Sequence, residues 1–269
     1  MWILQEMLKG DKNSNYLRFR KALDDLGIEY LIVYYNSNKE LKALKDNFIV
    51  SENSEEIIEK ALSKPFIIRG SVLLDEQLKT HKNNVLGIKN YNLDFSNILE
   101  IIDEKDLVNI PKQIGNIDSI YPIADEFFMR PVKDNKAING GIYTEGQFYE
   151  IKRNAHKYNN EKLLSSELIM SELVEIKEEY RFFILNNKII TYSSYRIGSN
   201  LDNFNEVPEK VIRYVNKVLL KYKLGCHLVI DIAVLGNGEI KILEFNGVSA
   251  SGLYNCDEYV LIKELNKLI

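Results

Sequence analysis

The sequence is poor in the residue types on which several kinds of site depend. Its 269 residues include only two cysteines, three histidines and one tryptophan. Two cysteines are too few for a disulfide framework, and Cys226 and Cys256 do not have the spacing of a metal site. We therefore expect two reduced thiols, as in a cytoplasmic protein.

Long apolar runs and a large net charge are also missing. No stretch approaches the roughly 20 apolar residues that cross a bilayer, and the first six residues, MWILQE, lack the basic start of a secretory signal. The net charge of −4 gives no reason to expect a broad nucleic-acid surface, although it leaves room for one basic cleft. These absences predict a cytoplasmic protein without a membrane segment.

Several motifs that would identify an enzyme class do not occur. There is no Walker A sequence, no G-x-G-x-x-G after a strand and no H-E-x-x-H pair. The G-x-S-x-G pattern of a nucleophile elbow is absent as well. A P-loop enzyme, a dinucleotide-binding domain, a zinc protease and a serine hydrolase are therefore poor interpretations of this chain.

The first third of the chain alternates strand and helix. This order is typical of a small open α/β domain, which we expect over residues 1–107. Apolar spacing and turn residues predict strands near 2–8, 28–35 and 66–68 and helices near 16–26 and 54–62.

From Tyr121 onward the strands become longer and alternate between apolar and polar residues. Asn186-Asn187 and Asn237-Gly238 each interrupt such a pattern, so each predicts a hairpin. Pro208 opens a predicted helix that closes at Gly225, and a last helix is expected over 258–268. This part of the chain therefore predicts an α+β fold with antiparallel sheet.

The second hairpin carries the most informative local feature. If Asn237-Gly238 forms a two-residue type I′ turn, the register places Asp231 directly opposite Glu244, with Asn246 on the same face. Two carboxylates facing each other in apolar strands repel, unless a cation lies between them or one is protonated. Carboxylate and amide oxygens are ligands that Mg²⁺ accepts, so the pattern predicts a magnesium site.

Two alternatives apply to this hairpin. The carboxylates could instead be exposed on the solvent face of an edge hairpin. A three-residue loop would also separate them, because a shift of one residue moves a strand's side chains to the opposite face.

Arginines occur within or at the ends of strands, where a rigid fork suits phosphate or carboxylate. Arg130, Arg181 and Arg196 have this placement, and Glu179 shares a face with Arg181 by the period of two. Arg130 is followed by Lys133, Lys136 and Gly140-Gly141, a combination that suits polyphosphate. The alternative for each arginine is a paired surface residue.

Together, these elements resemble the ATP-grasp superfamily over roughly residues 120–269. The matching segments are Arg130 to Lys136, an interlobe strand over 168–174 and the run from Glu179 to Ile190. Arg196, Asp231 and Glu244-Phe-Asn246 also match. The Arg130-Pro-x-x-Asp134-x-Lys136 run and the tail 246–254 are most similar to the divergent arginine-plus-two-lysines clade found in phage and bacteria.

The resemblance implies a fold and a set of roles. An α/β domain, 1–107, would precede a first lobe, 108–170, and a second lobe, 171–269, with antiparallel sheets around a nucleotide cleft. ATP phosphates would be held by Arg130 with Lys133 or Lys136, adenine would meet the backbone of Glu172 and Val174, and Glu179 would meet the ribose. Mg²⁺ would bind Asp231, Glu244 and Asn246, while Arg181 and Arg196 would steady the transferred phosphoryl group or a substrate carboxylate.

The function that the resemblance implies is ATP-dependent ligation. A carboxylate would be activated as an acylphosphate and captured by an amine or thiol, and the substrate could be a peptide or a protein. One alternative is an ATP-binding assembly factor that holds a protein partner and turns over little. The other is a catalytically inactive ATP-grasp fold, which the presence of all three metal ligands disfavours.

Overall fold

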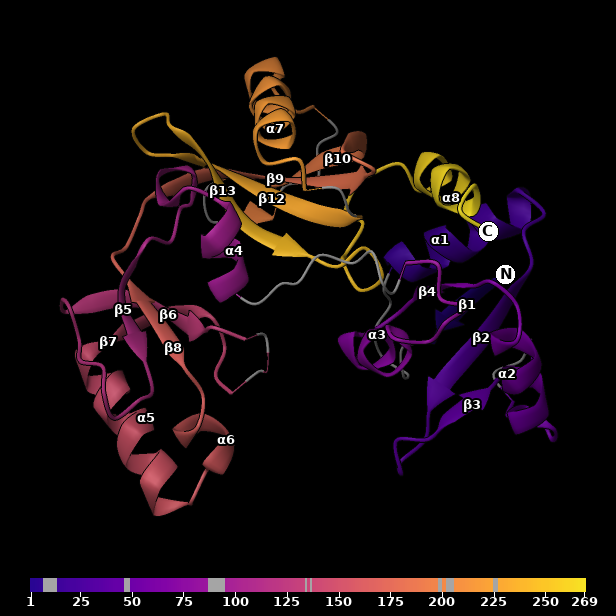
Figure 1. Ribbon diagram of the computed structural model, residues 1–269, viewed down its shortest axis with the longest axis horizontal. Helices are drawn as coiled ribbons and strands as arrows, with labels where there is room; N and C mark the ends of the chain where they lie inside the picture. Colours follow the sequence, from indigo (N-terminus) through magenta and orange to yellow (C-terminus); the bar gives the residue numbers. More distant parts are fainter. Residues whose placement is uncertain are drawn as a thin grey trace.

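Strands in the described part of the chain form three sheets, one for each third of the fold (Figure 1). The computed structural model describes residues 1–6, 14–45, 49–86, 95–133, 135, 137–197, 200–201, 206–224 and 227–269. An α/β unit is followed by two antiparallel sheets, as the sequence predicts.

The N-terminal sheet has the order β3-β2-β1-β4, with β1 parallel to β2 and β4 and with β3 antiparallel at the edge. Its apolar core strands pack between helices, which explains their continuous hydrophobic runs. The strands are β1 (Trp2–Gln5), β2 (Tyr30–Tyr35), β3 (Leu41–Ala43) and β4 (Ile67–Arg69), and the helices are α1 (Ser14–Asp25), α2 (Ser54–Leu62) and α3 (Val72–Leu78).

A connecting segment leads from this unit to the rest of the chain. It contains α4 (Phe95–Ile101) and a short 3₁₀ helix, η2 (Glu104–Asp106). Phe95 and Ile98 belong to the hydrophobic core of the third sheet, and the Val108 amide donates to the Ile242 carbonyl at 2.9 Å. The connection is therefore packed against the C-terminal part of the fold.

The second sheet is antiparallel with the order β5-β8-β6-β7. Helix α5 begins with a capping box, in which Thr144 and Gln147 each accept from the other's backbone N–H. The strands are β5 (Pro111–Gly115), β6 (Glu126–Pro131), β7 (Gly141–Thr144) and β8 (Leu168–Ser171), and the helices are α5 (Glu145–Lys157) and α6 (Glu161–Leu164).

The third sheet is antiparallel with the order β11-β10-β9-β12-β13, and helix α7 covers one face (Figure 1). Alternate side chains of β9 and β12, including Phe182 and Ile230, pack against α7, while Arg181 and Asp231 point to the other face. The elements are β9 (Ile176–Leu185), β10 (Lys188–Ile197), β11 (Asn200–Leu201), β12 (Leu228–Leu235), β13 (Ile240–Asn246) and α7 (Glu209–Tyr222).

The two hairpins differ in how well the sequence predicted them. Asn186 and Asn187 both have positive φ, 49° and 60°, and form the predicted two-residue turn. The prediction of a two-residue turn at Asn237-Gly238 is wrong. Leu235 pairs with Glu239 around a three-residue loop, and Gly238 is the one residue of that loop with positive φ, at 86°. This is the usual three-residue hairpin that closes with a residue in the left-handed region.

The predicted pairing of Asp231 with Glu244 is nevertheless confirmed. Ile232 pairs with Ile242, and the next pair is Asp231 with Glu244, so Leu243 is an extra residue in a β-bulge. The bulge compensates for the longer loop and returns both carboxylates to one face.

The C-terminal helix α8 (Glu258–Asn266) lies beside α1 of the N-terminal unit (Figure 1). Leu261, Ile262 and Leu265 share a core with Phe19 and Leu23 of α1. The chain therefore returns to its first unit after completing the third sheet.

Two further expectations concern the cysteines and the membrane. Cys256 is buried and free, and Cys226 lies outside the described residues. None of the helices in the described ranges has both the length and the apolar character needed to cross a bilayer.

The turn geometry predicts the effect of substitutions at Gly238. Gly238→Ala should lower the free energy of unfolding by about 1–2 kcal/mol, since a Cβ disfavours the left-handed region although nothing lies within 4 Å of it. Gly238→Asn should recover much of this loss because Asn tolerates positive φ. The control is Gly247→Ala, which also meets nothing within 4 Å and has no positive φ. Urea unfolding that gives equal losses for both alanine variants would contradict the assignment.

Candidate functional site

A cavity of about 520 Å³ is lined by residues of the second and third sheets and of the segments between them. This volume lies within the usual range of small-molecule sites. Seven of the residues that the sequence analysis singled out line it: Arg130, Gly140, Gly141, Val174, Glu179, Arg196 and Glu244.

The cavity combines an apolar part with fixed charges. Phe128 and Ile142 from one sheet and Leu173 and Leu243 from the other side supply apolar surface. Such a lining suits a ligand that combines an apolar ring with charged groups.

Two arginines give the cavity its positive charge. Arg130 lies near the end of β6, and its guanidinium carbon is 5.9 Å from the centre of the Phe95 ring. Arg196 Nη1 is 3.3 Å from Glu179 Oε1, on the strand pairing that places these two residues opposite each other. The alternative of a paired arginine thus applies to Arg196, whose side chain is still 46% exposed.

Arg181 lies outside the cavity lining, in a buried ion pair with Asp231. Its Nε and Nη2 donate to the two carboxylate oxygens of Asp231 at 2.8 Å and 2.6 Å, across directly paired positions of β9 and β12. Burial raises the pKa of the Asp231 carboxyl, and the two hydrogen bonds from Arg181 oppose that rise. Neither residue lines the cavity.

Two tyrosines that the sequence analysis did not single out enclose Arg181. The rings of Tyr195 and Tyr254 stack with centres 4.7 Å apart, and the Arg181 guanidinium carbon lies 5.5 Å and 4.9 Å from them. Burial raises the pKa of the Tyr195 hydroxyl, which keeps it neutral beside Glu179. Tyr195 also lines the cavity.

Two of the register irregularities in the third sheet border the cavity. Tyr195 is the extra residue of β10 opposite β9, and Leu243 is the extra residue of β13 opposite β12. Both of these side chains line the cavity. Bulges commonly redirect side chains next to active sites, and neither one is marked by glycine or proline in the sequence.

The carboxylate pair meets at the side chain of Asn246. Asn246 Nδ2 donates to Asp231 Oδ2 at 3.2 Å and to Glu244 Oε1 at 2.9 Å. The three predicted metal ligands are therefore adjacent, and the alternative of an exposed pair is wrong for Asp231, which is completely buried.

The donor set fits a hard divalent cation at Glu244 and Asn246. Both supply oxygen ligands, and Glu244 reaches the cavity. Asp231 accepts from Arg181 at both oxygens and from Asn246 at Oδ2, which leaves acceptor capacity for a cation at Oδ1. Within the described ranges, no three His, Cys, Asp or Glu side chains form a metal site, so Asn246 and ligand oxygens would have to complete this one.

Two predicted cofactor-binding residues do not join the cavity lining. Lys133 is exposed, and the carboxylate of Glu172 is 3.3 Å from Lys112 Nζ beside a smaller cavity of about 220 Å³. Val174 borders both cavities. A third predicted residue, Lys136, lies outside the described residues.

Removal of one member of the buried ion pair should destabilise the fold. Arg181→Met should lower the free energy of unfolding by about 3–5 kcal/mol, because it leaves the buried Asp231 carboxylate without an opposite charge. The matched control is Arg196→Met, which breaks a partly exposed pair and should cost less than about 1 kcal/mol. Denaturant unfolding measures both, and similar losses would show that burial of Asp231 carries no penalty.

Solved structures of several ligases share this fold. A D-alanine–D-alanine ligase from Helicobacter pylori superposes with a TM-score of 0.61 at 12% identity, covering 99% of this chain and 96% of that one. A D-cycloserine synthetase gives a TM-score of 0.60 at 12% identity, covering 100% and 99%. A D-alanine–D-alanine ligase from Bacillus anthracis complexed with ATP gives 0.57 at 15% identity, covering 99% and 91%. At these identities the likeness shows the fold.

The sequence itself settles the family. None of the curated proteins matches the chain. The model of family 2 in the arginine-plus-two-lysines clade of ATP-grasp domains matches residues 110–263. These residues span more than half of the chain and contain both antiparallel sheets with the cavity between them. The chain therefore belongs to family 2 of the arginine-plus-two-lysines clade of ATP-grasp domains.

Proposed function

We propose that this protein is an ATP-dependent ligase that activates a carboxylate as an acylphosphate and transfers the acyl group to an amine or thiol. The observation that carries the proposal is one cavity in which two arginines and the Glu244 carboxylate, with Asn246 beside it, face an apolar surface. Family membership and the ligases that share its fold support the same reaction class.

The lining suggests how ATP would lie. The apolar surface around Val174 and Leu243 would take the adenine, and the Glu179 carboxylate would accept from the ribose hydroxyls. Arg130, together with Lys136, would hold the phosphates by charge-assisted hydrogen bonds. Glu244 and Asn246, with Asp231 behind them, would hold Mg²⁺, which when bound neutralises phosphate charge.

The arginines of the cavity supply the positive charge that the proposed reaction requires. A substrate carboxylate must approach the γ-phosphate, and two anions meet only where fixed cations offset their repulsion. Arg196 is the cavity arginine placed to do this, and its pairing with Glu179 orients the guanidinium. Arg181 would act from behind by fixing Asp231 and the tyrosine pair. Positioning of the reactants would provide much of the remaining rate.

The substrates are proposed only by class. The related structures bear the names of D-alanine–D-alanine ligases and a D-cycloserine synthetase, which is consistent with a small amino acid as one substrate. A peptide or protein substrate, as in a modifying enzyme, is the finer alternative within the same chemistry.

The test is release of ADP from MgATP in the presence of amino acids, peptides or cell lysate. We expect a stimulated rate in the wild type and none in Glu244→Gln, which removes the charge that faces the cavity and leaves the side-chain shape. Glu244→Gln should unfold in urea like the wild type, because it also removes like-charge repulsion across the hairpin. Tight ATP binding without stimulated turnover would favour an ATP-binding assembly factor instead.

The phosphate assignment separates two nearby cations. Arg130→Ala should weaken ATP binding roughly 10- to 100-fold, since a charge-assisted contact is lost. Lys133→Ala provides the comparison, because Lys133 is exposed and outside the cavity lining, and its effect should be less than about threefold. Calorimetric titration with MgATP measures both. Equal affinities for the two variants would remove Arg130 from the phosphate site.

A further inference from the structure

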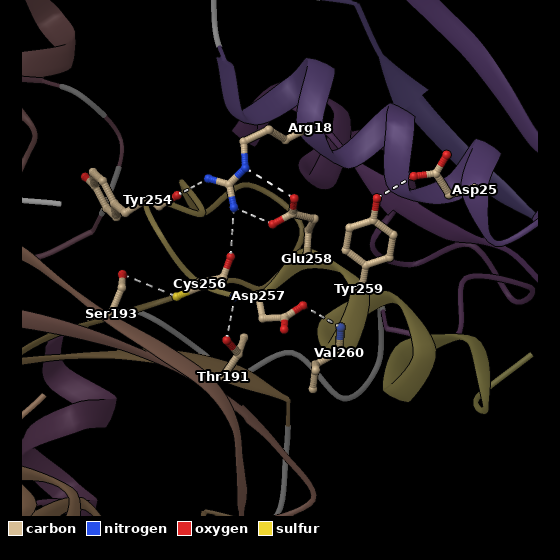
Figure 2. A network of polar contacts seen from close by, with 10 residues as sticks. All are labelled: Arg18, Asp25, Thr191, Ser193, Tyr254, Cys256, Asp257, Glu258, Tyr259 and Val260. Atoms are coloured by element: carbon tan, nitrogen blue, oxygen red, sulfur yellow. Dashed lines mark hydrogen bonds and ion pairs between the residues drawn. The ribbon is translucent and has the colours of Figure 1, made fainter. Parts of the chain in front are cut away.

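Arg18 of helix α1 binds residues 254–258, in the segment that follows the hairpin of β12 and β13 (Figure 2). Its Nη1 donates to the Tyr254 carbonyl at 2.6 Å, and its Nη2 donates to the Cys256 carbonyl at 3.3 Å. The same guanidinium binds both carboxylate oxygens of Glu258, with Nε 3.2 Å from Oε1. One side chain of the N-terminal unit therefore fixes three points within five residues.

Tyr254 needs such a support because of its backbone. Its φ is 49°, in the left-handed region that a bulky residue rarely adopts. Residues held in sparsely populated regions persist only where surrounding contacts determine them. The short hydrogen bond from Arg18 to the Tyr254 carbonyl is a contact of that kind.

The ring of Tyr254 packs against the buried residues beside the cavity. It stacks on Tyr195 and lies over the guanidinium of Arg181, whose Nη1 donates to the Gly252 carbonyl at 3.1 Å. Arg181 in turn binds both oxygens of Asp231. A continuous set of contacts thus joins Arg18 on α1 to Asp231 on β12, although Arg18 and Tyr254 do not line the cavity.

Other contacts at the same junction bypass Tyr254. The Tyr259 hydroxyl of α8 donates a hydrogen bond to the Asp25 carboxylate of α1 (Figure 2). The Asp257 amide donates to Thr191 Oγ1 at 2.7 Å. These contacts hold α8 against α1 and β10 without touching the tyrosine pair. They supply a control for general loosening of the junction.

We infer that Arg18 is a positioning residue for the reaction, which sets Tyr254 against Arg181 and so fixes the Arg181–Asp231 pair beside the phosphate and metal groups. The kinetic part of this inference rests on the proposed function. Arg18 acts through Tyr254, so its loss should slow the chemical step and leave the ATP cavity unchanged.

The experiment combines kinetics with structure. In substrate-stimulated ADP release from MgATP, Arg18→Met should lower kcat roughly 10- to 100-fold, as small displacements in a positioned site do, with KM for ATP within about twofold of the wild type. Arg18→Lys, which restores a cation beside Glu258, should recover part of the rate. The matched control, Tyr259→Phe, should keep the wild-type kcat.

A double-mutant cycle tests whether Arg18 acts through Tyr254. Asn tolerates the left-handed backbone, so Tyr254→Asn removes the ring without adding strain. In that background, Arg18→Met should lower kcat by less than a further factor of about two. Independent full effects of the two substitutions would overturn the inference.

The crystal structure of the Arg18→Met variant, or of Arg18→Lys if the first does not fold, gives an answer that does not depend on activity. We expect the Tyr254 ring to leave the Arg181 guanidinium. A ring still stacked there, or an unchanged kcat, would overturn the inference. A wild-type protein that binds MgATP but releases no ADP with amino acids, peptides or cell lysate would count against the proposed function alone, and the crystal structure would then decide the role of Arg18.

Discussion

The buried ion pair between Arg181 and Asp231 is the interaction on which the rest of the site depends. Two charges removed from water are stable together only with good geometry and further hydrogen bonds, and the direct pairing of β9 with β12 supplies that geometry. Asn246 adds a donor to Asp231, and two tyrosine rings cover the guanidinium. Glu244 and Arg196, which do not belong to this pair, line the cavity.

Local irregularities of the third sheet shape this wall. Regular antiparallel pairing would alternate every side chain between the α7 face and the cavity face. The bulges at Tyr195 and Leu243 interrupt that alternation where the cavity lies, so that an aromatic and an aliphatic side chain join the charged residues there. The apolar surface and the charges of one site thus come from the same short stretches of strand.

The N-terminal unit is tied to this site by arginines that bind backbone. Arg69, at the end of β4, donates to the carbonyls of Val248 and Ser251, and Arg18 holds Tyr254 and Cys256. The segment after β13 has few regular hydrogen bonds of its own, so its carbonyls take their donors from the preceding unit. The N-terminal unit therefore supports the segment whose Tyr254 packs against Arg181.

Local signals predicted the α/β beginning, the antiparallel remainder and the hairpin at Asn186-Asn187, because periodicity and turn residues act over short stretches of chain. The facing of Asp231 and Glu244 was also predicted, but from a two-residue turn that does not form. The loop at Asn237-Gly238 and the bulge at Leu243 are each invisible in the pattern, and their effects on the register cancel. Whether Arg181 meets substrate or Asp231, and whether Lys133 reaches the cavity, depends on neighbours far along the chain. Burial and partner choice are properties of the packed fold, so only the packed fold could assign them.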